Sequence, residues 1–308
     1  KMPTLKNEKN VITLSNKITQ GFTTDYEKAA AIYSFVLHYM EYDDVLASNI
    51  DRRGKTYVSV YSQNELDSLL LIKHKESINK SIETKIGVCE DYARLFYELS
   101  INSDLKCKMI PGIFRNDYNS NYITDDTTLH MWNAVSLNNK WYIIDCTKGD
   151  GGNDFNFTYF MVEPSIAIYI NYPEKDSLQF LSSIVSKKEF LTYPKLSYNF
   201  PKYSLRDIEY WNLNGEFIVS FESDFNSISF LLYYKRQSTF YMIRNEKLYK
   251  LKDGESLESD IKYEKKLNNK HHFTFNKNYK FDMIEFYYFE EENGAISSSD
   301  IMKIIVDK

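Results

Sequence analysis

Cysteine is scarce in this sequence, and its few occurrences exclude two kinds of site. Three cysteines, Cys89, Cys107 and Cys146, cannot form an even disulfide framework. They also lack the paired CxxC or Cys/His spacing of a zinc site, and the five histidines include no H-x-x-x-H pair. We therefore expect free thiols, and no metal or cofactor.

Long apolar runs and basic tracts are also missing. No stretch approaches 18 continuous apolar residues, so the sequence predicts no membrane span. Ten glycines and six prolines are too few for a loop-rich or collagen-like chain. The formal charge is −5, with Lys and Arg scattered among Asp and Glu, so there is no basic field of the kind that binds nucleic acid.

The first ten residues are polar and contain no apolar h-region, so we expect no signal peptide within this sequence. This observation does not decide the cellular location of the protein. The composition, rich in Lys, Asn, Ile and Tyr, looks bacterial, and chains of this type are often exported. We slightly favour an extracellular or cell-envelope location over the cytoplasm.

The composition that is present favours a folded protein of two domains. The chain has 308 residues, of which 43% are hydrophobic and 16% aromatic, which argues against general disorder. The pattern changes near residue 201, where short segments rich in Phe, Tyr, Ile and Val begin, separated by turn signals such as Asn214-Gly215. Residues 201–308 are therefore expected to form an antiparallel β-sandwich, and residues 1–200 a separate domain.

One amphipathic helix is expected to start at Cys89 and run to about residue 102. Apolar residues recur after it at helical spacing, and Gly87 allows a tight turn into the first turn of the helix. A thiol there lies among unpaired N–H groups at the positive end of the helix dipole, which favours the nucleophilic thiolate. The alternative for a single cysteine on a helix is a buried structural role.

A β-hairpin is expected to present a histidine and an aspartate on one face. Residues 130–137 and 140–146 alternate as strands, and Asn138-Asn139 between them suits a two-residue turn because Asn tolerates positive φ. Leu137 then faces Lys140, and His130 becomes a diagonal neighbour of Asp145 on the same face. A three-residue turn would separate them.

Cys89, His130 and Asp145 together have the chemistry of a thiol-dependent acyl-transfer site. The thiolate attacks a carboxamide carbon, the imidazole moves the proton, and the carboxylate orients the imidazole. The N–H of Cys89 is a natural donor to the oxyanion of the tetrahedral intermediate. No second donor is identified; the upstream candidates are Tyr57, Tyr61 and Gln63, each with a structural role as the alternative.

Three motifs now resemble the transglutaminase-like superfamily: GVCEDYA at 87–93, HMWNAV at 130–135 and WYIIDCT at 141–147. Their order and intervals agree with that family, and residues 160–190 look like its kyphoscoliosis-peptidase branch. The resemblance covers about residues 10–200 and implies an α+β, papain-like core that is catalytic. Lys148 departs from the family's usual Trp, and Asn171 from a frequent His.

The resemblance implies an enzyme that forms a thioester between Cys89 and a protein or peptide substrate. We expect acyl transfer from protein glutamine to an amine, with cysteine peptidase or deamidase activity as the alternative. A different class, a non-catalytic protein-binding scaffold, is the rival hypothesis, and the complete triad argues against it. The C-terminal β domain is expected to serve recognition.

Overall fold

The computed structural model describes residues 5, 8–53, 62–115, 127–149, 157–197, 205–214, 216–223, 228–234, 237–244, 247–250, 261–266, 269–276, 280–292 and 295–306. The chain divides into two compact units. One contains Lys1–Ile113, Leu129–Pro164 and Pro173–Phe180, and the other Phe114–Thr128, Ser165–Tyr172 and Leu181–Lys308. The expected boundary near residue 201 stays a prediction.

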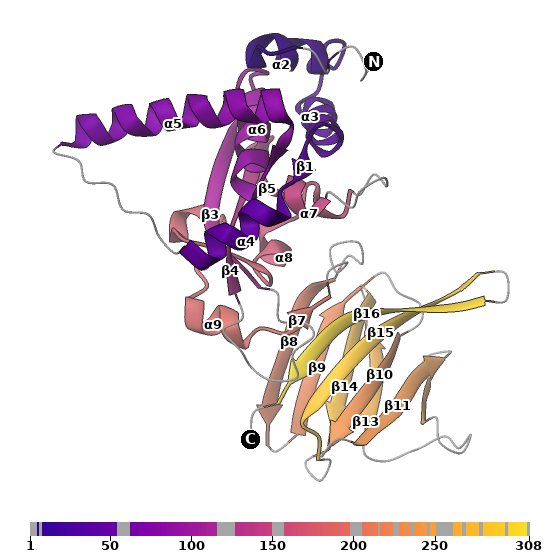
Figure 1. Ribbon diagram of the computed structural model, residues 1–308. Helices are drawn as coiled ribbons and strands as arrows, with labels where there is room; N and C mark the ends of the chain where they lie inside the picture. The colour runs from indigo at the N-terminus through magenta and orange to yellow at the C-terminus, as the bar shows by residue number, and fades with distance from the viewer. Residues whose placement is uncertain are drawn as a thin grey trace. The chain divides into compact units, whose positions relative to one another are not determined.

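The first unit is built mainly from helices around a small sheet (Figure 1). Its helical elements are α2 (Val11–Thr19), α3 (Asp25–Tyr39), α4 (Asp44–Arg53), α5 (Gln63–Thr84), α6 (Cys89–Ile101), α7 (Cys146–Gly149), η1 (Phe157–Tyr159) and η2 (Asp176–Leu178). A two-stranded parallel sheet joins β1 (Glu41–Tyr42) to β2 (Ile86–Gly87), directly before α6. Helix α8 (Pro164–Ala167) follows along the chain.

The sequence predicts a helix with Thr24 or Asp25 as its N-cap and Glu27 in its first turn, and α3 begins there, closed by a capping box. The Glu27 N–H donates to the Thr24 hydroxyl at 3.2 Å, and the Thr24 N–H donates to the Glu27 carboxylate at 3.0 Å. These bonds satisfy two of the donors that a helix N-terminus leaves free. Helix α6 also has the expected span, from Cys89 to Ile101.

One hydrophobic core joins these helices to the sheet. Helix α3 contributes Ile32, Tyr33 and Val36, and α6 contributes the apolar stripe after Cys89. The members of the stripe, all at most 2% exposed, are Tyr92, Ala93, Leu95, Phe96 and Leu99. This packing fixes the helix that carries Cys89, since fully burying each large side chain contributes roughly 1.5–3 kcal/mol.

A four-stranded sheet has the strand order β5-β4-β3-β6. Its strands are β3 (Cys107–Arg115), β4 (Thr127–Leu137), β5 (Lys140–Ile144) and β6 (Asn171–Pro173). Leu137 pairs with Lys140 across the turn, and Asn138 and Asn139 have φ of 49° and 63°. The predicted two-residue turn and its register are therefore confirmed.

One segment of this unit differs from the sequence prediction, and for another the structure gives no test. The apolar residues between 66 and 82, Ile72, Ile78 and Ile82 among them, predict one or two helical turns, and the structure has the single 22-residue helix α5 instead. Ile78 and Ile82 are buried on it as expected, whereas Ile72 is 53% exposed. The alternating residues 57–61 predict a short strand or the wall of a groove, and they lie outside the described residues.

The second unit is dominated by two antiparallel sheets, with strand orders β12-β11-β10-β15-β16-β7 and β13-β14-β9-β8 (Figure 1). Short helix α9 (Lys187–Thr192) also belongs to this unit. The strands are β7 (Lys195–Leu196), β8 (Arg206–Leu213), β9 (Glu216–Glu222), β10 (Ile228–Tyr234), β11 (Gln237–Arg244), β12 (Lys247–Lys250), β13 (Ile261–Lys266), β14 (Lys270–Phe275), β15 (Met283–Glu292) and β16 (Ala295–Ile305).

Aromatic side chains pack between the two sheets. The ring of Phe230 in β10 lies 5.5 Å from that of Phe273 in β14, and Phe221 in β9 lies 5.3 Å from Phe286 in β15. Edge-to-face contacts of this kind are favourable for aromatic pairs. The fold is thus α+β with a C-terminal β-sandwich, as the sequence predicts.

Three details of the sandwich differ from the sequence prediction, and one is strand β7 (Lys195–Leu196), which pairs with β16 although it precedes residue 201. Strand β8 was not expected, and only Ile208 among its residues is buried. The sequence predicts the last strand at residues 301–306, whereas β16 begins at Ala295. Within the described parts of the chain, the helices are all too short or too polar to cross a membrane.

Candidate active site

Cys89 is the first residue of α6 and is half-buried. Val88, the residue before the helix, has extended backbone angles and no capping side-chain hydrogen bond. Among the described residues, the backbone N–H groups of Cys89 and Glu90 have no acceptor. The thiol therefore lies beside free donors at the positive end of the helix, as the sequence predicts.

His130 and Asp145 meet beside this thiol. The Nε2 atom of His130 lies 2.7 Å from Oδ2 of Asp145, and the two residues are 9% and 2% exposed. The thiol of Cys89 also interacts with the imidazole. Because Asp145 occupies Nε2, the ring nitrogen left for the thiol is Nδ1. The structure brings all three predicted site residues together.

The electrostatics of the pair favour a charged imidazole. Burial opposes the charge on His130, but the Asp145 carboxylate and the Cys89 thiol outweigh it and raise the pKa of His130 to about 9. Burial likewise acts to raise the pKa of Asp145, but the His130 charge and the Lys148 charge and backbone N–H hold it below its usual value. An imidazolium beside a thiol can hold that thiol as a thiolate in an ion pair.

Asp145 is held in place by the short helix α7 that follows it. Its Oδ1 accepts the Lys148 N–H at 3.0 Å, and its own N–H donates to the Tyr159 carbonyl at 3.0 Å. Gly149 completes this turn, and a Cβ added there would lie 1.8 Å from the Tyr33 hydroxyl oxygen. With Oδ1 committed, Oδ2 is the oxygen that faces His130.

Lys148, which departs from the family pattern, lies within electrostatic range of Cys89 and Asp145. Burial lowers the pKa of Lys148, and these two groups act in the opposite direction. In the sequence, Lys148 is notable only because it replaces the family's usual Trp after the third motif. The structure indicates that it brings a positive charge toward the thiol.

Three further residues of the last two motifs have packing roles. Trp132 is 1% exposed, and its ring lies 5.9 Å from that of His130, so it packs beside the imidazole. Trp141 stacks on Phe180 at 4.7 Å. Cys146 is part of the hydrophobic core.

Cys107 begins β3, and burial raises the pKa of its thiol to about 12. A thiol with such a pKa is protonated at neutral pH and is therefore a poor nucleophile.

The sequence names three upstream candidates for a second oxyanion donor. Two of them, Tyr57 and Tyr61, lie outside the described residues. Gln63 is exposed at the start of α5. No described group of His, Cys, Asp and Glu side chains is arranged to hold a metal ion.

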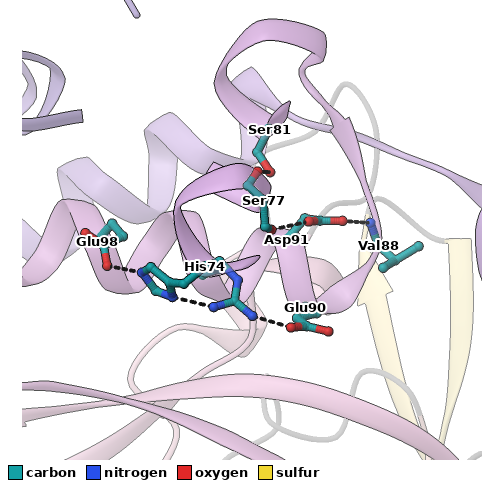
Figure 2. A network of polar contacts seen from close by, with 8 residues as sticks. His74, Ser77, Ser81, Val88, Glu90, Asp91 and Glu98 are labelled. Carbon is teal, nitrogen blue, oxygen red and sulfur yellow. Dashed lines mark hydrogen bonds and ion pairs between the residues drawn. The ribbon is translucent and has the colours of Figure 1, made fainter. Parts of the chain in front are cut away.

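A polar network joins the start of α6 to α5 (Figure 2). The Asp91 carboxylate accepts the Val88 N–H at 3.0 Å and the Ser77 hydroxyl at 2.8 Å. Glu90, the residue after the nucleophile, pairs with Arg94 along the helix. The bond between Asp91 and Ser77 depends on the packing of α5 against α6, so no local sequence pattern predicts it.

A buried amide links the helix of the nucleophile to the sheet. The Nδ2 group of Asn133, in β4, donates to the Ala93 carbonyl of α6 at 2.9 Å and to the Lys108 carbonyl of β3 at 3.4 Å. Asn133 is fully buried and lies three residues after His130. It therefore connects the element that carries the thiol to the strand that carries the imidazole.

The family comparison agrees with this geometry. Residues 12–146 match the model of the transglutaminase-like superfamily. Residues 12–146 form a transglutaminase-like domain. The match contains Cys89, His130 and Asp145, and it ends one residue after the aspartate.

Several curated proteins are similar to the chain that carries this transglutaminase-like domain. Human kyphoscoliosis peptidase is 25% identical over 187 residues, which are 58% of this chain and 25% of that protein. Hillarin of Drosophila melanogaster is 25% identical over 225 residues, covering 65% of this chain and 24% of that protein. Lim and transglutaminase domain protein ltd-1 of Caenorhabditis elegans is 28% identical over 140 residues, covering 39% of this chain and 19% of that protein. The aligned region thus spans a quarter or less of each relative.

Proposed function

We propose that this protein is a thiol-dependent acyltransferase that acts on protein or peptide amides through a thioester on Cys89. The observation that carries the proposal is the buried His130–Asp145 contact of 2.7 Å beside the thiol. A nucleophile, a base within reach of it and a group that orients the base are the parts that acyl transfer needs. We assign these roles to Cys89, His130 and Asp145.

The first half of the reaction forms the thioester. The Cys89 thiolate attacks the amide carbonyl carbon, and the oxyanion that develops accepts the Cys89 N–H. The His130 imidazolium then gives its proton to the leaving nitrogen, the C–N bond breaks, and ammonia or an amine departs. Asp145 keeps the imidazole in the right orientation and stabilises its charge.

The second half transfers the acyl group. His130, now neutral, takes a proton from an incoming amine or water as this nucleophile attacks the thioester carbon. The C–S bond breaks and Cys89 leaves as a thiolate, which restores the starting ion pair. An amine gives a new amide, and water gives a carboxylic acid.

We favour a protein-glutamine donor and an amine acceptor, since the motifs are those of the transglutaminase-like superfamily. A second candidate is a cysteine peptidase or deamidase with the same triad. It is supported by the relatives called kyphoscoliosis peptidase. The β-sandwich is the part of the chain that we propose for substrate recognition.

Two measurements on one sample separate these candidates. The protein is incubated with a glutamine-rich protein and a fluorescent primary amine, and the products are examined by gel and by mass spectrometry. Incorporation of the amine supports acyl transfer, new chain ends support a peptidase, and a mass increase of about one unit per glutamine supports a deamidase. Absence of all three, with wild type indistinguishable from Cys89→Ala, supports the scaffold hypothesis and contradicts the enzyme.

A further inference from the structure

The backbone before Cys89 is held by a side chain from within α6. A helix usually receives its first cap from Ser, Thr, Asp or Asn at the N-cap position, but here that residue is Val88. The Asp91 carboxylate acts instead, and its Oδ2 accepts the Val88 N–H at 3.0 Å. Its Oδ1 accepts the hydroxyl of Ser77 on α5 at 2.8 Å, so the carboxylate is anchored on both sides (Figure 2).

This bond leaves the Cys89 N–H available to a substrate. In the first turn of α6, the Val88 N–H is taken by Asp91, and the N–H groups of Asp91 and Tyr92 donate to the Val88 carbonyl. The N–H groups of Cys89 and Glu90 are the ones with no acceptor among the residues described here. The Glu90 carboxylate is directed to Arg94 and cannot fold back onto them while that pair is made.

Gly87 leaves the space that the Asp91 carboxylate occupies. A Cβ at this position would lie 2.5 Å from the Cβ of Asp91 and 2.7 Å from its Oδ2, both closer than real Cβ contacts. A side chain at Gly87 would therefore displace the carboxylate that holds Val88. The requirement for glycine here comes from Asp91, two residues beyond the nucleophile.

We propose that Asp91 is a positioning residue for acyl transfer: by holding the Val88 N–H it fixes the Cys89 N–H where the acyl oxyanion forms. The proposal rests on the proposed function, because it takes Cys89 as the nucleophile. Asp91 touches neither substrate nor the reacting atoms. Its effect is confined to steps in which an oxyanion develops.

Two reagents distinguish positioning from a general loosening of the helix. Acylation of Cys89 by p-nitrophenyl acetate passes through a tetrahedral oxyanion, whereas alkylation by iodoacetamide does not. In Asp91→Ala we expect the acylation rate to fall by about ten- to a hundredfold, a cost typical of a poorly placed donor, with the alkylation rate within about twofold of wild type. Asp91→Asn should keep most of the acylation rate, because its amide oxygen can still accept the Val88 N–H.

The chain offers a matched control in α3. Glu27 holds the Thr24 N–H at 3.0 Å, the same capping contact at a helix without a nucleophile. Glu27→Ala should lower the thermal midpoint by an amount similar to Asp91→Ala and leave both rates unchanged. Gly87→Ala, which displaces the same carboxylate, should reproduce the selective loss of acylation even if Asp91→Ala fails to fold.

Each outcome bears on a separate claim. Equal losses of acylation and alkylation in Asp91→Ala and Gly87→Ala, or no loss in either, overturn the positioning role. If wild-type Cys89 reacts with neither reagent faster than a model thiol, the proposed function fails instead. A selective loss in both variants, with Asp91→Asn and Glu27→Ala close to wild type, supports the role of Asp91.

Discussion

Oδ2 of Asp145 lies 2.7 Å from Nε2 of His130, although the β4–β5 ladder ends earlier, at the pair Asn133 and Ile144. The two side chains therefore meet just beyond the regular hairpin, where the strands no longer bond to each other. Helix α7 starts directly after Asp145 and holds its other oxygen. One carboxylate oxygen of Asp145 therefore bonds the backbone of α7, and the other contacts the imidazole.

Replacing this carboxylate by an amide should stop turnover and spare the fold. In Asp145→Asn the side chain keeps its shape but loses the charge that raises the pKa of His130. We expect the acyl-transfer rate to fall by about a thousandfold or more, as for the loss of a triad carboxylate. The exposed Asp176→Asn is the control. A rate within tenfold of wild type would show that Asp145 does not serve His130.

The raised pKa of His130 should make stability depend on pH. The folded pKa of about 9 exceeds the usual 6.5, so the folded state binds the proton more tightly. The stabilisation is complete below about pH 6.5 and is lost as pH rises toward about 9. Urea unfolding of wild type and His130→Gln across this range should show this slope in wild type only. Equal slopes in both proteins would contradict it.

Lys148 should accelerate the reaction of Cys89 through its charge. Its ammonium lies within electrostatic range of the thiol, where a positive charge favours thiolate. In Lys148→Met we expect alkylation at pH 7 to slow by about two- to tenfold, an effect of roughly 0.4–1.4 kcal/mol. Lys140→Met, which removes an exposed lysine paired with Glu163, is the control. An unchanged alkylation rate would show that the charge of Lys148 does not influence Cys89.

A second pH effect should arise in the β-sandwich at His271. This residue is 2% exposed and its Nδ1 lies 2.9 Å from the Tyr263 hydroxyl oxygen. Burial and the nearby Lys265 lower its pKa to about 4, below the usual 6.5. The unfolded state therefore binds the proton first, and stability should fall by about 2–3 kcal/mol as pH drops from about 6.5 to about 4.

His271→Gln should remove this loss, and His272→Gln on the neighbouring, partly exposed position should not. Urea unfolding at pH 7, 5 and 4, followed by circular dichroism, measures the difference. If His271→Gln loses stability between pH 6.5 and 4 as steeply as wild type, another group is responsible.

Local patterns predict much of this molecule. The Asn138-Asn139 turn fixes the hairpin register because two consecutive positive φ angles suit a two-residue loop and few others. The stripe after Cys89 predicts a helix with one buried face, and that face lies in the core. Three motifs in the right order then predict a transglutaminase-like domain.

Long-range packing explains what the patterns do not predict. Strand β8 buries only Ile208, so its residues carry too little alternation to mark a strand. The bonds from Asp91 to Ser77 and from Asn133 to Ala93 join elements that are distant in sequence. Polar side chains of this kind have no periodicity that would reveal their partners before the fold is known.

The reactivity of Cys89 toward iodoacetamide at pH 7, mapped by mass spectrometry, tests directly whether the His130 imidazole and the Cys89 thiol form one reactive pair. We expect Cys89 to be labelled faster than a model thiol and much faster than Cys107 and Cys146. We also expect His130→Ala to abolish this advantage. Labelling of Cys89 no faster than the model thiol, or at the same rate in His130→Ala, would show that imidazole and thiol form no such pair.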